Sequence, residues 1–95
     1  MSVYAIAQSQ TNDQKALDAY VALAVPTLEA HNVKVLALDD SPTNIEGAIE
    51  RTRTVILEFS DTAAFHAWYD SPEYQSAKKH RLNASIGTFI LVKGI

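Results

Sequence analysis

The sequence predicts an α+β fold in which one antiparallel sheet carries its helices on a single face. Two observations lead to this prediction. Short β-favourable segments and amphipathic segments follow one another in the order strand, helix, strand, strand, helix pair, strand. In addition, 95 residues are enough for only one domain, so residues 1–95 are expected to share one core.

The first strand and the first helix are distinguished by their periodicity. Val3 to Gln8 alternates large and small side chains in a β-favourable composition, and the turn-forming residues 11–13 follow. From Lys15 onward, apolar side chains recur at spacings of three and four, namely Leu17, Tyr20, Val21, Ala24, Val25 and Leu28. This spacing predicts an amphipathic helix. Pro26 lies within the stripe and predicts a kink or an early end of the helix.

The middle of the chain contains a second strand and a polar connection. Asn32 tolerates the left-handed conformation and can close the first helix. Val33 to Leu38 is the second predicted strand, and the turn residues 39–42 follow it. A short extra strand over Asn44 to Ile49, interrupted at Gly47, is compatible with the composition of the connection.

The second half of the chain predicts a strand, two helices and a final strand. Arg53 to Phe59 is the third strand, and the polar residues 60–61 can cap a short helix. The apolar stripe of that helix is aromatic: Phe65, Trp68 and Tyr69. Residues 71–73 combine a capping serine, a first-turn proline and an acidic residue, so they start another helix that continues to about Leu82. Ile86 to Val92 then completes a ferredoxin-like βαββαβ sheet with the first and third strands at its centre.

Both faces of this sheet are predicted to be apolar. In the third strand, one face carries Val55, Leu57 and Phe59, and the other carries Thr54, Ile56 and Glu58. In the second strand, the two faces carry Val33, Val35 and Ala37 and Lys34, Leu36 and Leu38, respectively. In the fourth strand, one face carries Ile86, Ile90 and Val92, and the other carries Phe89 and Leu91. An open face that carries Ile56, Leu36 and Leu38 would be a large exposed apolar patch, which soluble monomers usually avoid. We therefore expect a homodimer through this face, with two sheets closing into an α/β barrel.

Several classes of function are not expected. The chain has no cysteine, only three glycines and no glycine-rich phosphate loop, and its histidines lack metal-binding spacing, so neither a metal nor an organic cofactor is predicted. A formal net charge of -3 argues against nucleic acid as a partner. No apolar run approaches the roughly 20 residues of a membrane span, and the N-terminus does not resemble a signal peptide, so a cytoplasmic location is expected.

Glu58 is the first candidate for chemistry. It shares a strand face with Ile56, so a barrel interior would partly desolvate its carboxylate, as suits a group that donates or accepts a proton. In the alternative interpretation the carboxylate lies in water or is neutralised by Arg51, Arg53 or Arg81.

Tyr74 and Arg81 are candidate contacts to a ligand, because their spacing places them on one face of the helix that starts at Pro72. Arginine would hold a carboxylate through its planar fork, and the tyrosine hydroxyl would orient a carbonyl or enol oxygen. The alternative makes Tyr74 a core residue and pairs Arg81 with Glu58 or Glu73.

Three residues of the preceding aromatic helix are open to more than one interpretation. The spacing of Trp68 relative to Phe65 is typical of a buried stripe. Tyr69 could be core or could open toward a ligand, because a buried hydroxyl needs a hydrogen-bond partner. His66 is offset from the stripe and is expected to be exposed, although it could also serve as a base.

The same residues carry a resemblance to a known family. The segments Glu58-Phe59, Ala67-Trp68-Tyr69, Ser71-Pro72-Glu73-Tyr74-Gln75 and Leu91-Val92-Lys93-Gly94, with Val25-Pro26 and Arg81, resemble the domain of unknown function family 1330. The chain departs from the family pattern at His31-Asn32, where a glycine pair is common, and at the polar segment 83–85. The resemblance implies a dimeric α/β barrel, a fold shared with antibiotic-biosynthesis monooxygenases, but no assigned reaction.

These observations lead to an expected function. The chain is expected to bind a small carbonyl-bearing or aromatic metabolite between sheet and helices, with Tyr69, Tyr74 and Arg81 as contacts. If it is an enzyme, Glu58 or His66 would move a proton without any cofactor, as in monooxygenase- or isomerase-like reactions. The alternative is a homodimer that binds a ligand without turnover or has a structural role.

Overall fold

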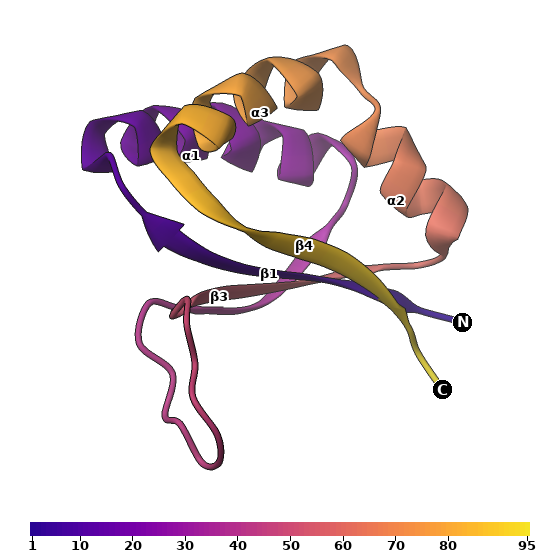
Figure 1. The fold of residues 1–95 in the computed structure, drawn as a ribbon. Helices are drawn as coiled ribbons and strands as arrows, with labels where there is room; N and C mark the ends of the chain where they lie inside the picture. The colour runs from indigo at the N-terminus through magenta and orange to yellow at the C-terminus, as the bar shows by residue number, and fades with distance from the viewer.

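The computed structural model describes residues 1–95 and contains a four-stranded antiparallel sheet with three helices on one side (Figure 1). The strands are β1 (Val3–Thr11), β2 (Lys34–Asp39), β3 (Arg53–Phe59) and β4 (Ser85–Lys93), and their order in the sheet is β2-β3-β1-β4. The first and third strands are therefore central, and the predicted ferredoxin-like α+β fold is confirmed.

Each helix begins at a capping side chain. The helices are α1 (Gln14–Ala30), α2 (Thr62–Tyr69) and α3 (Pro72–Ala84). Asp13, Asp61 and Ser71 each accept a hydrogen bond from a backbone N–H of the first turn, which satisfies a donor that has no partner inside the helix. The predicted starts of the two later helices are thus confirmed. None of the three helices is long and apolar enough to cross a membrane.

The core lies between the helices and one face of the sheet. Trp68 and Tyr74 are its largest fully buried side chains, and their ring centroids are 4.0 Å apart. The Trp68 indole N–H donates to Thr27 Oγ1 at 3.0 Å, and Thr27 in turn donates to the carbonyl of Ala24 at 2.6 Å. The indole is therefore satisfied without water, and Trp68 has the core role that its spacing predicts.

Some element boundaries differ from the prediction. β1 extends to Thr11, because it pairs with β4 along its whole length. The segment 44–49 forms no strand, since it lies in the long connection that extends away from the sheet (Figure 1). The helix α1 continues through Pro26 without the predicted early end. Asn32 adopts a positive φ of 55° just after it, as its residue type predicts.

The face assignment of β2 was partly wrong. The strand register shifts between Val35 and Ala37, so that Ala37 pairs with Ile56 and Leu38 pairs with Val55. A β-bulge of this kind reverses the alternation of side chains beyond it. Leu38 therefore faces the helices rather than the open side of the sheet.

The open face of the sheet is nevertheless largely apolar. In β1, β3 and β4 the register aligns the open-face residues Tyr4, Ile6, Ile56, Ile90 and Val92 in neighbouring rows. Ile90 is 55% exposed in the single chain. The connection between β2 and β3 extends away from the helices on this side (Figure 1), and its Ile45 is 85% exposed.

Candidate functional site

A cavity of about 190 Å³ lies between the helix-facing side of the sheet and the helices α1 and α3. All four strands contribute to its lining on one side, and α1, α3 and Trp68 of α2 contribute on the other. Most of the lining is apolar and includes Val21, Val25, Leu28, Leu38, Val55, Leu57, Trp68 and Phe89. An apolar cavity with a few polar groups is the usual form of a small-molecule site.

Two tyrosine hydroxyl groups meet at this cavity. Tyr20 Oη from α1 and Tyr74 Oη from α3 are 3.0 Å apart, and the two rings pack edge to face with centroids 6.3 Å apart. Burial, followed by the proximity of Tyr74, raises the pKa of Tyr20 far above the usual value for tyrosine. The Tyr20 hydroxyl is therefore neutral at physiological pH and can donate a hydrogen bond.

Arg81 carries a buried donor that has no acceptor. Its Nε is buried and makes no hydrogen bond to any protein atom. The guanidinium carbon lies 5.6 Å from the centroid of the Phe89 ring, which gives a cation–π contact but no acceptor for the N–H. Because an unsatisfied buried donor costs about 1–3 kcal/mol, such a group is unusual in a stable fold.

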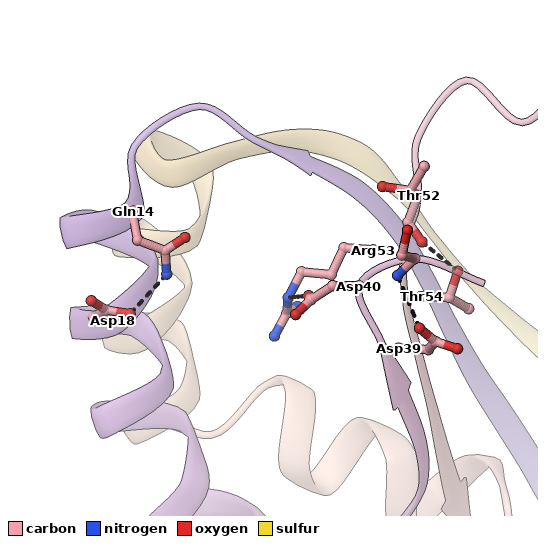
Figure 2. Close-up of polar contacts among 8 residues, drawn as sticks. Gln14, Asp18, Asp39, Asp40, Thr52, Arg53 and Thr54 are labelled. Carbon is pink, nitrogen blue, oxygen red and sulfur yellow. Dashed lines mark hydrogen bonds and ion pairs between the residues drawn. The ribbon is translucent and has the colours of Figure 1, made fainter.

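The cavity opens through a polar groove of about 670 Å³ between α1 and the ends of β2 and β3. Ser9, Leu17, Val21, Leu38 and Arg53 line both the groove and the cavity, so the two are continuous. Arg53 Nε is 3.3 Å from Asp40 Oδ1, and Figure 2 shows this pair opposite the first turns of α1, where Gln14 and Asp18 lie. Arg53 therefore lies where the groove meets the cavity.

Comparison with known proteins places the chain in a family. The model of the family described as domain of unknown function (DUF1330) matches residues 2–95. The chain belongs to the DUF1330 family. No curated protein matches the sequence of this DUF1330 domain.

Solved structures share the fold of this DUF1330 domain at low sequence identity. A protein of unknown function from Rhodopseudomonas palustris has a TM-score of 0.84 and 20% identity, over 99% of this chain and 82% of that chain. A dimeric ferredoxin-like protein of unknown function from Jannaschia sp. has a TM-score of 0.70 and 16% identity, over 99% and 100%. SnoaB, a cofactor-independent oxygenase from Streptomyces nogalater, has a TM-score of 0.68 and 10% identity, over 99% and 93%.

The DUF1330 fold brings together two of the five predicted site residues. Tyr74 and Arg81 both line the cavity, as their shared helix face predicts. Tyr74 is at the same time a core residue, so its two interpretations are compatible. Neither Glu58 nor Glu73 is within ion-pair distance of Arg81, which leaves the arginine without the carboxylate partner considered for it.

Glu58 lies on the other side of the sheet from this cavity. It pairs across β1 with Tyr4 on the open face, and its carboxylate is 3.9 Å from Lys34 Nζ. Lys34, rather than one of the three arginines considered, is thus its ion-pair partner. Glu58 and Arg81 are therefore not positioned to contact the same small ligand within one chain.

His66 and Tyr69 of α2 also lie outside the cavity lining. His66 is exposed, as expected, and its Nδ1 is 3.6 Å from Asp70 Oδ2. The Tyr69 ring stacks on Phe65 at a centroid distance of 5.4 Å, and Lys78 Nζ lies 5.0 Å above it. The packing of Tyr69 thus matches its core interpretation, and its role as a ligand contact stays a prediction.

Sequence reasoning missed two polar groups of the cavity in this DUF1330 chain. Tyr20 was treated as a member of the apolar stripe of α1, although a hydroxyl within such a stripe requires a hydrogen-bond partner. Arg53 shares the helix-facing side of β3 with Val55, two positions away. A charged residue on a core-facing strand position was the signal that could have identified it.

Proposed function

We propose that this DUF1330 domain binds a small, partly apolar metabolite with a carbonyl group or an aromatic ring in the cavity between its sheet and helices. The observation that carries this proposal is the buried Arg81 Nε, which has no acceptor and belongs to a side chain that lines the same cavity as Tyr20 and Tyr74. A carbonyl or carboxylate oxygen would supply the missing acceptor.

The binding function is tested by looking for a bound compound. The purified protein is analysed by native mass spectrometry and then by a thermal-shift screen of carbonyl-bearing and aromatic metabolites. We expect at least one compound whose stabilisation is lost in Arg81→Met and kept in Lys79→Met. Lys79 is a matched control, because it lies on the same helix α3 but is exposed. Equal stabilisation of both variants would contradict the proposed site.

We further propose that the protein is a homodimer through the open face of its sheet. The apolar rows that include the exposed Ile90 and the partly buried Ile56 support this assembly, as does the connection between β2 and β3, which extends on the same side (Figure 1) and carries the exposed Ile45. The fold is also shared with the Jannaschia protein that is described as dimeric. Two such faces packed together would enclose Glu58 between subunits.

Turnover without a cofactor is the second candidate function. The fold shared with the cofactor-independent oxygenase SnoaB supports it. The cavity lining contains no carboxylate and no imidazole, so a proton carrier such as Glu58 or His66 would have to act outside it. Incubation of a bound compound with wild-type protein, Glu58→Gln and His66→Gln, followed by mass spectrometry of the products, tests this function. The enzymatic function requires that the wild type forms a product that at least one of the two variants does not form.

A further inference from the structure

The cavity contains more positive charge than its lining can neutralise. Arg53 and Arg81 both line it, whereas no aspartate or glutamate does. Arg81 forms no ion pair, and its Nε lacks an acceptor. Because a partly buried cation without a counterion is unfavourable, this arrangement favours a negatively charged ligand over a neutral one.

The only carboxylate within ion-pair distance of either arginine belongs to a residue at the surface. The Arg53 side chain is 15% exposed, whereas that of its partner Asp40 is 77% exposed. An ion pair with such an exposed member contributes little to stability. Arg53, whose pair with Asp40 is drawn in Figure 2, can therefore exchange Asp40 for the carboxylate of a ligand at small cost, because Arg53 lines both the groove and the cavity.

The tyrosine pair adds a neutral donor to the same region. One hydroxyl donates to the other in the Tyr20–Tyr74 contact, so one O–H remains free to donate to a ligand. The positive charges of Arg81 and Arg53 each act to lower the pKa of Tyr20, against the larger effect of burial. Both charges are thus close enough to influence the Tyr20 hydroxyl. The cavity lining thus contains two guanidinium groups and one hydroxyl that is free to donate.

The size and the lining of the cavity restrict the rest of the ligand. A cavity of roughly 150 Å³ is enough to hold benzene, and this one measures about 190 Å³. Val21, Val55 and Phe89 provide apolar walls around the space that remains. A single ring or a short branched chain would fit, whereas a fused polycyclic body would not.

We propose that the ligand is a small organic monoanion, in which one carboxylate is attached to an aromatic ring or to a short branched hydrocarbon chain. The carboxylate accepts hydrogen bonds from Arg81 Nε and from the free tyrosine hydroxyl, and Arg53 provides the second charge contact. This inference rests on the binding function proposed above, and it adds the charge and the size of the ligand.

Matched pairs of acid and amide test the charge directly. Dissociation constants are measured by isothermal titration calorimetry, at low ionic strength, for benzoate and benzamide, phenylacetate and phenylacetamide, and 3-methylbutanoate and 3-methylbutanamide. Within each pair the apolar body is the same. We expect at least one carboxylate to bind ten times more tightly than its amide, because the amide leaves the Arg81 guanidinium without a counterion.

Variants assign the binding to the cavity. Arg81→Met and Arg53→Met should each weaken binding of the carboxylate tenfold or more, and Lys79→Met should leave it unchanged. Arg81→Lys should bind the carboxylate more tightly than Arg81→Met but less tightly than the wild type, since a lysine keeps the charge but lacks the planar guanidinium group. If Arg81→Met does not fold, as judged by circular dichroism, then Arg53→Met and Arg81→Lys still provide the test.

The possible results separate this inference from the binding function. Equal binding of acids and amides, abolished by Arg81→Met, would overturn the charge of the ligand but retain the binding site. Carboxylate binding that is insensitive to both arginine substitutions would overturn the inference, because the anion would then bind elsewhere. Binding of none of the six compounds would count against both the inference and the proposed function.

Discussion

The hydroxyl oxygens of Tyr20 and Tyr74 lie 3.0 Å apart in the interior of the protein, although 54 positions separate the two residues in the chain. This contact joins α1 to α3 directly above the helix-facing side of the sheet. It is the one side-chain hydrogen bond between the two helices within the cavity. The free energy of this hydrogen bond therefore bears on both the stability of the fold and the integrity of the candidate site.

Removal of either hydroxyl should destabilise the fold. Tyr20→Phe and Tyr74→Phe each leave the other buried hydroxyl without its partner, which we expect to cost about 1–2 kcal/mol in the free energy of unfolding. The double variant should lose less than the sum of the two single variants, because it leaves no orphaned hydroxyl. Urea denaturation of all four proteins measures this coupling. Strictly additive losses would mean that the two hydroxyl groups do not interact.

The hydrogen bond of Trp68 can be tested through Thr27. Thr27→Val keeps the shape of the side chain but removes the acceptor of the indole N–H, and should cost about 1–3 kcal/mol in the free energy of unfolding. Thr27→Ser keeps the hydroxyl and should lose less. Trp68 is the only tryptophan, so its fluorescence follows unfolding of the core without a label. If serine and valine destabilise equally, the hydroxyl is not the group that matters.

The raised pKa of Tyr20 predicts a loss of stability at alkaline pH. An exposed tyrosine in the unfolded chain titrates near pH 10, whereas the folded protein holds the Tyr20 proton to higher pH. Below about pH 10 both states keep this proton, so the contribution is fully present. Above about pH 10 the unfolded state loses the tyrosine proton before the folded state does. The free energy of unfolding should therefore fall by up to about 1.4 kcal/mol per pH unit.

Tyr20→Phe isolates this effect from the titration of other groups. Melting temperatures of wild type and variant are compared from pH 8 to pH 11. The difference between them should shrink steadily above about pH 10, because only the wild type loses the stabilising contribution of the neutral hydroxyl. A difference that stays constant with pH would show that the Tyr20 pKa is not raised by folding.

The open face of the sheet should be an association surface. Ile90→Asp places a charge where the single chain already leaves the side chain 55% exposed, so it should disrupt a dimer without unfolding the subunit. Light scattering at micromolar concentration should give the dimer mass for wild type and the monomer mass for Ile90→Asp. Leu23→Asp is the matched control, because Leu23 is an exposed leucine on α1, away from this face. A monomeric wild type would contradict the proposed assembly.

The fold could be predicted from the sequence because its signals are local. The spacing of the α1 stripe, the caps at Asp61 and Ser71 and the alternation along β3 are all properties of short segments. The bulge between Val35 and Ala37 was not predictable in this way, since it shifts one strand against another without any glycine or proline to mark it. Leu38 was consequently placed on the wrong face.

The candidate site could be predicted only in part. Tyr74 and Arg81 share a helix face, so their proximity follows from the 3.6-residue period. Tyr20 lies on α1 and Arg53 lies on β3, so their presence in the same cavity as Tyr74 and Arg81 depends on how α1 packs on the sheet. The separation of Glu58 from this group follows from the alternation within β3, which places Glu58 on the opposite face of the sheet from Arg53 and Val55.

The sequence by itself determined the order of the elements, where the helices begin and that both faces of the sheet are apolar, because each of these depends on residue chemistry and on spacing along a few turns or strands. Only the tertiary structure decided which polar groups meet in the interior. The packing of α1 and α3 over the sheet brings Tyr20 within hydrogen-bonding range of Tyr74 and places Arg53 and Arg81 in the lining of one cavity, although these residues come from distant segments of the chain.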